Sequence, residues 1–570
     1  MVKQIGMHLR KFRIGPFGIT AFVILVLNAC MRLALIAHNW PLTNSDEDTL
    51  GLMALHIAYH GQFPIFFYGQ SFLGPLEAYV GAVIFLLSSP TVFSLRLGMI
   101  LLFTLFLVSM YLLTSLLYTK KLALFTLVVL SLGSPEVLLR ELAAQGGHPE
   151  TPLFGAVIVL FTTWLALTYK PNLSPRDQKR RIMLYGIWGC ILGVAFWNDP
   201  LATPFILTAG LGLILFCRAE LRKATLLSIV LGILVGVSPL LIYNFTSPIE
   251  KSSLSLFGFF TYQGPAQPHP SIIGKFAAAL LVLLPLATEA NPLCPLTRQQ
   301  VWPITGQSSP HVIQCTLVHG TWGLGIIVLW AIAAFIAVRE FRSSILAHSP
   351  EERRAAVIRF ARLMLLASAG LSFIVFTFSA QGVLDPWFNN RYLVAFAVAT
   401  PAVLWPLWAA LAAKRPARCM SFRLINAKKI LSYGLLLLLV ATLVKGTIDT
   451  FQQIPQVEAE TRQDYTLVHD LLDLGATHMY TDYWTCDLVI FLSRERIVCA
   501  TLDEQLKPAL DRYIPYKEIV NSDPHSSYVF PIGSPQATAF VSKIAKSGKH
   551  YQHTIIDGYD IYQPIIQGSS

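Results

Sequence analysis

The chain has 570 residues, of which 54% are hydrophobic and only 13% are charged, and its mean hydropathy is +0.56. A soluble protein carries about twice that charged fraction, so the composition excludes a soluble globular enzyme and indicates a polytopic membrane protein. The net charge of +11 does not indicate nucleic-acid binding, because the basic residues fall in short loops between apolar runs.

The N-terminal segment places four basic residues before an apolar run that starts at Phe17. A signal peptide has the same layout. The run is long enough to span a bilayer and lacks a small-residue cleavage site, so we expect an uncleaved first transmembrane helix.

The next segment, 44–81, opens with the acids Asp46, Glu47 and Asp48. Two amphipathic stretches follow, at about 49–60 and 72–87, and an aromatic run joins them. Surface acids are most often merely solvated. Here the length and aromatic content of the flanks favour a reaction site at the membrane surface.

Apolar runs of spanning length predict eleven transmembrane helices. Their number decides which loops are expected on the inner side of the membrane and which on the outer side. They lie at about 15–37, 94–118, 122–139, 152–169, 183–198, 200–217, 224–243, 320–338, 362–380, 392–412 and 430–447.

The basic residues give the orientation. With the N-terminus inside, six inner segments hold 26 Lys and Arg with five acids, whereas the outer side before the last span holds eight basic residues. This asymmetry follows the positive-inside rule. Counting the shorter runs 72–87 and 272–287 as spans would place basic clusters outside, so we expect both to lie on the outer surface.

The polar segment after the last span carries about half of the 32 acids. It predicts a small α/β domain outside the membrane. The expected helices are 467–474 and 537–545, and the expected strands are 477–483, 489–492, 496–501, 527–530 and runs within 550–562. The organisation predicted is thus a mainly α transmembrane module, 1–447, with outer loops 38–93 and 244–319, and an extracytoplasmic α/β domain, 448–570.

Eight cysteines in a chain of this length do not form a disulfide scaffold. Cys294 and Cys315 share the long outer loop, and Cys486 and Cys499 share the outer domain. In an oxidising compartment each pair could bridge, the alternative being buried thiols, while the other four cysteines should stay reduced.

Polar groups gather at the outer ends of the predicted spans. Besides the acidic triplet they are Glu77, Arg140, Glu141, His148, Glu150, Asn198, Asp199, Asp385, Trp387, Asn389, Asn390, Arg391 and Tyr392. Asp199 and Asp385 precede prolines and are equally explained as helix caps. His148 with Glu150 supplies half a usual metal-ligand set, and an exposed histidine is the simpler interpretation.

These groups suit one kind of chemistry. A carboxylate at the outer interface can act as general base on an acceptor hydroxyl, and arginine can hold a phosphate. Interfacial helices can hold a lipid tail. Together they predict transfer of a group from a lipid phosphate to an acceptor outside the membrane.

The layout resembles the type-C integral-membrane glycosyltransferases that use polyprenyl-phosphate sugars. The similar families are the protein O-mannosyltransferases and the lipid A aminoarabinose transferases. The resemblance rests on the Asp46–Glu47 pair in the first outer loop, the two surface helices after it and Arg96 at the start of the second span. YGQSFLGPLEAYVGA, NNRYLV and TDYW resemble a bacterial branch with an outer C-terminal domain. One departure is Leu73-Gly74-Pro75, where the aminoarabinose transferases have Glu-Lys-Pro.

The resemblance implies an inverting hexosyl- or pentosyltransferase of the cell membrane, with a cytoplasmic N-terminus. It moves sugar from a polyprenyl-phosphate carrier to a glycan, lipid or protein acceptor. Asp46 is the expected base and Glu47 shapes the site. Donor and phosphate binding fall to Arg391, Arg96, Tyr68 and Glu77, and the second outer loop contributes His148 and Glu150. The proposed reaction requires no cofactor. A divalent metal ion is compatible with it, but no residue is assigned as a metal ligand.

Two other classes stay open at this stage. A transporter or flippase of lipid-linked glycans would place charged groups near the bilayer midplane and break helices in paired positions. A non-catalytic scaffold would explain the outer domain and leave the acidic loop unexplained.

Overall fold

The computed structural model describes residues 15–147, 149–170, 174–248, 251–253, 271–300, 302–303, 308–344, 349–412, 422–547 and 550–565. Ten described helices are long and apolar enough to cross a membrane. They are α2 (Pro16–Ala37), α5 (Val92–Leu117), α8 (Glu150–Leu167), α9 (Pro175–Asn198), η1 with α10 (Pro200–Cys217), α11 (Lys223–Thr246), α15 (Pro310–Arg342), α16 (Pro350–Phe378), α19 (Ala395–Ala412) and α20 (Phe422–Gln452).

An eleventh candidate is a bent pair, α6 (Lys120–Ser131) and α7 (Pro135–Leu142), which are long and apolar enough only together and meet at 92°. The predicted continuous span at 122–139 is therefore wrong in shape. The physical reason is local: the Ser134 hydroxyl accepts from the Val137 amide and starts a new helix at Pro135, whose ring cannot continue the preceding one.

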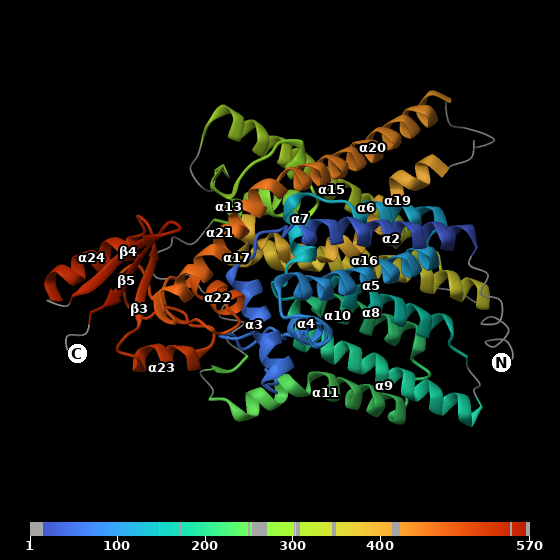
Figure 1. Ribbon diagram of the computed structural model, residues 1–570. Coiled ribbons are helices and arrows are strands. Elements are labelled where there is room, and N and C mark those ends of the chain that lie inside the picture. The colour runs from blue at the N-terminus through green and yellow to red at the C-terminus, as the bar shows by residue number, and fades with distance from the viewer. Residues whose placement is uncertain are drawn as a thin grey trace.

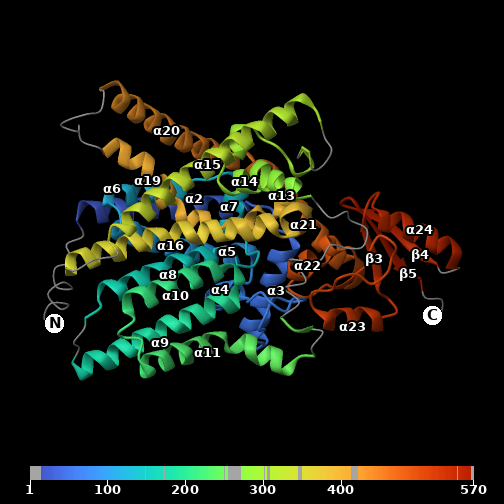
Figure 2. The ribbon, with the colours of Figure 1, turned by 180° about the vertical axis from the view of Figure 1, so that it is seen from behind.

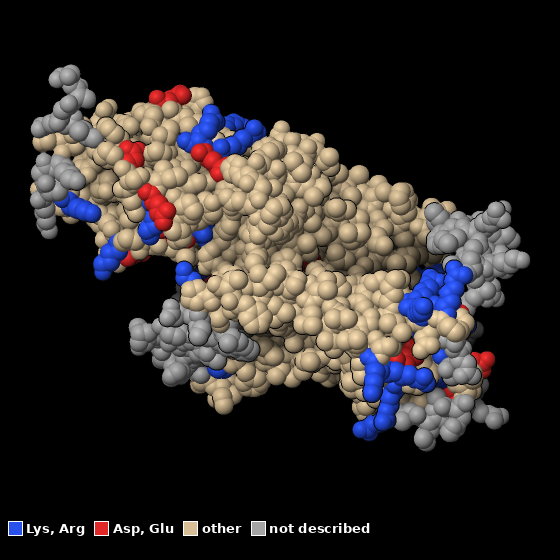
Figure 3. Space-filling view, turned by 90° about the horizontal axis from the view of Figure 1, so that it is seen from below, with Lys and Arg blue, Asp and Glu red and all other residues tan. Residues whose placement is uncertain are grey.

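The helices lie side by side, with the N-terminal end of the chain at one end of the bundle and the sheet domain at the other (Figures 1 and 2). The buried core of the bundle includes Phe106, Trp188 and Phe205. On the face in Figure 3, charged side chains gather at the two ends and leave an uncharged middle, and basic ones predominate at the end opposite the sheet. Large apolar side chains such as Leu207 and Val235 are exposed on the spanning helices. An apolar surface band of this kind identifies a multi-pass membrane protein.

Three shorter elements lie at the end that carries the sheet domain. They are α3 (Ser45–Tyr59), α4 (Leu76–Leu87) and the apolar segment Ile272–Ala287, which comprises α13, a π-helical turn and α14. All are shorter than a span, as predicted for 72–87 and 272–287. Short elements fill the loops: η4 (Asn291–Leu293), η5 (Arg298–Gln300), α17 (Gln381–Leu384), α18 (Pro386–Asn389) and η6 (Asn390–Leu393).

The C-terminal domain is built on a five-stranded sheet of order β2-β1-β3-β5-β4, in which β1 pairs in parallel with β2 and β3, and β5 pairs antiparallel with β3 and β4. Its elements are α21 (Ile454–Asp473), β1 (His478–Thr481), α22 (Tyr483–Leu492), β2 (Val498–Thr501), α23 (Ile514–Ser522), β3 (Ser527–Pro531), α24 (Pro535–Ser547), β4 (Tyr551–Ile556) and β5 (Tyr559–Pro564).

Two expectations for this domain need correction. The run 489–492 is not a strand but the end of α22, because Asp482 accepts from the amides of Trp484 and Thr485 and starts a helix there. The helix expected at 467–474 is only the end of α21, which begins at Ile454. The other predicted strands and the helix at 537–545 are confirmed within a few residues.

Both predicted disulfides are present. Cys294 bonds Cys315, and Cys486 bonds Cys499, with Cα–Cα distances of 5.1 and 5.7 Å. Cys30, Cys190 and Cys217 are free thiols, as predicted. Cys419 and His148 lie outside the described residues.

Candidate active site

The acidic triplet lies in the first turn of α3, and its geometry is set by Asn44. The Asn44 side chain accepts from the amides of Asp46 and Glu47 at 3.0 and 3.1 Å. Asn44, and not Asp46, is therefore the cap of this helix. Acids in a first turn also interact favourably with the helix dipole.

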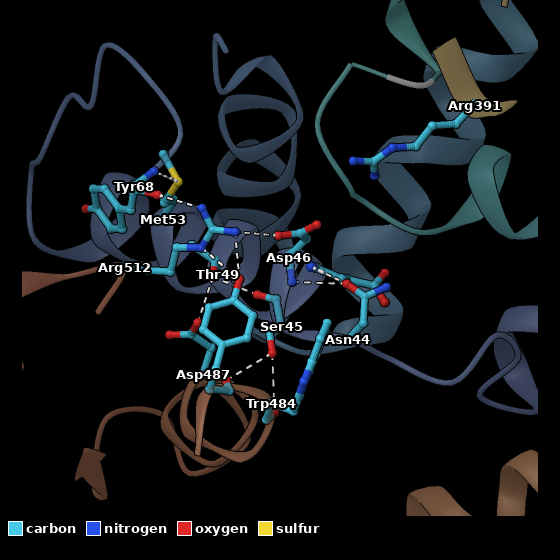
Figure 4. Close-up of polar contacts among 12 residues, drawn as sticks. Asn44, Ser45, Asp46, Thr49, Met53, Tyr68, Arg391, Trp484, Asp487 and Arg512 are labelled. Carbon is cyan, nitrogen blue, oxygen red and sulfur yellow. Dashed lines mark hydrogen bonds and ion pairs between the residues drawn. The ribbon is translucent and has the colours of Figure 1, made fainter. Parts of the chain in front are cut away.

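Asp46 is the member of the triplet that reaches the surface, with its side chain 26% exposed. Its Oδ1 accepts from Arg512 Nη2 at 2.8 Å. Figure 4 shows this contact between Arg512 and Asp46. Arg512 also donates to the Tyr483 hydroxyl at 2.6 and 2.9 Å and lies over the Phe67 ring. The C-terminal domain thus holds one oxygen of the predicted base.

Glu47 and Arg96 form a buried ion pair beneath this surface. Arg96 Nε and Nη2 donate to the two Glu47 oxygens at 2.8 and 2.6 Å, and Nη1 donates to the Asn39 carbonyl. Both side chains are at most 1% exposed. All three guanidinium nitrogens of Arg96 are used inside the protein. Arg96 thus fixes the start of α3 against α5.

Asp48 is fully buried, and Thr43 donates to its Oδ1. Burial raises its pKa well above the usual range. Next to it on α3, the Thr49 hydroxyl donates to Asp487 of α22 at 3.1 Å. Burial raises the pKa of Asp487 to about 7. The buried contact between Thr49 and Asp487 therefore joins α3 to the C-terminal domain.

Glu77 and Glu150 lie together, as the outer-face hypothesis requires, although away from solvent. Their carboxyl groups interact electrostatically, while the Gly146 amide donates to Glu77 at 2.8 Å and Asn198 donates to Glu150 at 3.0 Å. Burial, and then the charge of Glu150, raise the pKa of Glu77 well above normal. These groups hold α4 and the loop before α8 against the end of α9.

Asp199 and Asp385 are helix caps. Asp199 accepts from the Leu201 amide at 2.9 Å and from the Thr151 hydroxyl at 2.5 Å, and Asp385 accepts from the Phe388 amide at 3.1 Å. The capping alternative is therefore observed for both. Burial raises the pKa of Asp199 to about 7.

Arg391 lies on η6, and its guanidinium packs on the Phe388 ring at 3.8 Å. Within the described residues, its buried Nε and Nη1 have no hydrogen-bond partner, and only Nη2 donates, to Tyr392. In Figure 4 the guanidinium extends toward the N-terminal end of α3. Unpaired buried donors are costly, and these two nitrogens can donate to a hydrogen-bond acceptor that enters the site.

Arg140 of α7 is in electrostatic range of Arg391 and also has an unpartnered buried nitrogen, Nη2, among the described residues. It lines a cavity of about 70 Å³ together with Glu141 and apolar side chains that include Phe103, Phe106 and Leu393. That volume holds a few methylene groups and not a whole prenyl chain. Arginine forms charge-assisted hydrogen bonds with anions such as phosphate, so the free nitrogen of Arg140 is available to an anion in this cavity.

Tyr68 has a structural network around it. Its hydroxyl donates to Gln62, and His56 Nδ1 lies 2.7 Å from it. No sequence pattern predicted a role for Arg512, which is 466 positions from its partner Asp46. Arg140 was expected only as one polar residue of the second outer loop. Only the tertiary fold brings these arginines to the acidic loop and to Arg391.

No family model matches the sequence, and no curated protein matches it. The structure of ArnT from Cupriavidus metallidurans bound to undecaprenyl phosphate is similar, with 13% identity and a TM-score of 0.54, over 97% of this chain and 98% of that one. The apo structure of the same protein matches with 14% identity and a TM-score of 0.50, over 96% and 97% of the two chains. ArnT is a lipid A aminoarabinose transferase of type C. The chain therefore has the fold of the type-C glycosyltransferases, as its sequence predicts.

Proposed function

We propose that the protein is a glycosyltransferase that moves a sugar from a polyprenyl-phosphate carrier to an acceptor at the outer membrane surface. The observation that carries the proposal is the position of Arg391, whose guanidinium extends toward the helix end that carries the partly exposed carboxylate of Asp46 (Figure 4). Within the described residues, two buried nitrogens of Arg391 have no hydrogen-bond partner. The fold shared with ArnT, which binds undecaprenyl phosphate, supports this choice of carrier.

In the proposed reaction the acceptor hydroxyl attacks the anomeric carbon as Asp46 removes its proton. The bond from that carbon to the phosphate oxygen breaks, and the lipid phosphate leaves with the electron pair. Arg391 and Arg140 bind the phosphate and stabilise its charge. Direct displacement inverts the anomeric centre and needs no enzyme nucleophile.

Arg512 has a positioning role in this scheme. It orients Asp46 by binding Oδ1, and within the described chain no other side chain donates to this carboxylate. The second oxygen can then accept the proton. Glu47 and Arg96 hold the turn of α3 from which Asp46 projects.

The outer-face orientation belongs to the same proposal. The acidic loop and the sheet domain share one end of the bundle, and basic side chains predominate at the other on the face in view. The positive-inside rule then places Asp46 and the C-terminal domain outside the cytoplasm. The transporter alternative expects broken helices in pairs, whereas the described residues contain one bent pair.

The test compares wild type, Asp46→Asn, Arg391→Ala and a matched control, Asp473→Asn, whose side chain is 70% exposed. Envelope glycans from cells that carry each variant are analysed by mass spectrometry, and binding of undecaprenyl phosphate to each purified protein is measured by native mass spectrometry. Asp46→Asn should lower glycan transfer by ~10²–10⁴-fold and leave carrier binding intact. Arg391→Ala should weaken carrier binding by roughly 10–100-fold, because a charge-assisted hydrogen bond is lost.

The control should match wild type in both measurements. Full glycan transfer by Asp46→Asn would refute the assignment of the base. Unchanged carrier binding by Arg391→Ala would refute the phosphate site.

A further inference from the structure

A cluster of two histidines and a glutamate joins α3 to the C-terminal domain. His56 and His60 are one helical turn apart on α3, and Glu495 follows α22. His56 Nε2 lies 2.8 Å from Glu495 Oε1, and His60 Nε2 lies 3.5 Å from Oε2. One nitrogen or oxygen of each residue lies within 4.8 Å of the others.

The hydrogen bonds around His56 fix its tautomer. Gln62 Nε2 donates to the Tyr513 hydroxyl, so Gln62 Oε1 is the acceptor for the Tyr68 hydroxyl at 2.9 Å. Tyr68 has then used its proton, and its oxygen accepts from His56 Nδ1–H at 2.7 Å. The lone pair of neutral His56 is thus on Nε2, on the side of Glu495.

The Tyr516 hydroxyl lies 3.0 Å from His56 Nε2 and also contacts Glu495 Oε1. It has one proton, which it donates to Glu495 Oε1, so this oxygen is an acceptor as well. A lone pair on His56 Nε2 and a carboxylate oxygen therefore face one another at 2.8 Å. Two acceptors at this distance repel unless a cation lies between them. The geometry requires either a proton or a metal ion at this point.

The third residue, His60, distinguishes a metal ion from a proton. A proton bridges only His56 and Glu495, whereas His60 adds a second imidazole on the other carboxylate oxygen. Zinc binds nitrogen and oxygen ligands at about 2.0–2.2 Å, so tetrahedral ligands are separated by ~3.4 Å. The 3.5 Å separation of His60 and Glu495 already fits, and the His56 contact needs to widen by about half an ångström.

The surroundings match those of known metal sites. A metal-binding histidine usually donates its other ring N–H to an acceptor that orients it, as His56 does to Tyr68. His56 is 1% exposed and His60 is 46% exposed, so one side of the site is open to water as a fourth ligand. Glu495 is also held at a φ of 63°, a backbone conformation uncommon outside glycine.

Two other clusters of possible ligands among the described residues lack these features. In the group of Cys294, His311 and Cys315 the two sulfurs are joined in a disulfide. His469, Asp470 and Asp473 lie on the surface of one helix, and no second element contributes a ligand. Neither combines buried ligands with a fixed tautomer.

We propose that His56 Nε2, His60 Nε2 and the Glu495 carboxylate bind a divalent transition-metal ion, with zinc the best match to this ligand set. The ion clamps α3 to the C-terminal domain. His56 is ten residues from Asp46, or ~15 Å along the helix, so its role is to fix the helix rather than to act in the reaction. The proposal does not depend on the function proposed above.

The test measures zinc in the full chain, purified in detergent, stripped with a chelator and then titrated with Zn²⁺. Wild type should bind one zinc per chain in this cluster. His60→Gln and Glu495→Gln should weaken that binding by more than ~100-fold, since loss of a direct ligand exceeds the usual effect of losing a residue that only orients a ligand. His469→Gln, at a histidine 73% exposed, is the matched control and should bind as wild type does.

Zinc-edge X-ray absorption of the loaded protein gives a readout independent of affinity. The expected spectrum shows two imidazoles and oxygen ligands, and it should lose one imidazole in His60→Gln. His60 is partly exposed, so this variant is expected to fold, and its elution in size-exclusion chromatography checks that. Absence of zinc binding by wild type would show that a proton fills the gap and would overturn the proposal, as would equal affinities in wild type, His60→Gln and Glu495→Gln.

Discussion

Replacement of Glu47 by glutamine separates a structural role from a catalytic one. Glutamine keeps the shape of the side chain and leaves the Arg96 guanidinium buried without its counter-charge. Both partners are at most 1% exposed and share two hydrogen bonds of 2.6 and 2.8 Å. Removing one partner of a buried pair costs about 3–5 kcal/mol, which lowers the folding equilibrium constant by roughly two to three and a half powers of ten.

The assay is reversible unfolding in mixed micelles, followed by the fluorescence of the 11 tryptophans. Asp449→Asn is the matched control, because it breaks the ion pair with Lys445, whose side chain is 51% exposed, and should cost about 0–1 kcal/mol. The double variant Glu47→Leu/Arg96→Met should recover much of the loss, since no charge remains buried. A Glu47→Gln protein that is as stable as wild type would refute the structural role. If that stable protein were also inactive, Glu47 would act on substrate instead.

Two further predictions concern sidedness and pH. Membrane-impermeant maleimide should label Ser89→Cys from outside intact cells and Gln178→Cys only after permeabilisation. Both positions are exposed, Ser89 in the loop after α4 and Gln178 in the first turn of α9, and they lie on opposite sides of the predicted membrane. Labelling of both from outside would contradict the topology. Burial raises the pKa of Asp487 to about 7, above its unfolded value of ~3.9. Between these two pH values the folded state therefore binds one proton more than the unfolded state. The free energy of unfolding of wild type, relative to that of Asp487→Asn, should fall as pH rises through 7. Unfolding of both proteins at pH 5 and pH 8 measures the free energy of unfolding of wild type minus that of Asp487→Asn. A larger value at pH 8 than at pH 5 would contradict the prediction.

The membrane-spanning part of the fold could be predicted because it depends on local properties. An apolar run of about 20 residues leaves few alternatives to a spanning helix, and basic loops fix its direction. The disulfides followed from the same topology, since each pair shares one outer segment. The bend at Ser134 was missed because a cap and a proline interrupt a run whose hydropathy does not change.

The C-terminal domain was harder to predict for a physical reason. The short apolar run 489–492 fits a strand or a buried helix equally well, and the cap at Asp482 decides for the helix. In the candidate site, the position of Asp46 could be predicted, whereas its contact with Arg512 could not. That contact, like the one between His56 and Glu495, joins residues more than 400 positions apart.

The last span and the first helix of the C-terminal domain have a mechanical consequence. Helices α20 and α21 are separated only by Gln453, and a helical segment of 48 residues runs from Asn426 to Asp473. The sheet domain is therefore connected to the membrane by a nearly continuous helix instead of a flexible linker. The 20 residues of α21 extend ~30 Å, so a tilt of about 5° would move their far end by ~2.6 Å, nearly the length of a hydrogen bond. A bilayer whose thickness changes the tilt of α20 would thus also change how closely Arg512 approaches Asp46.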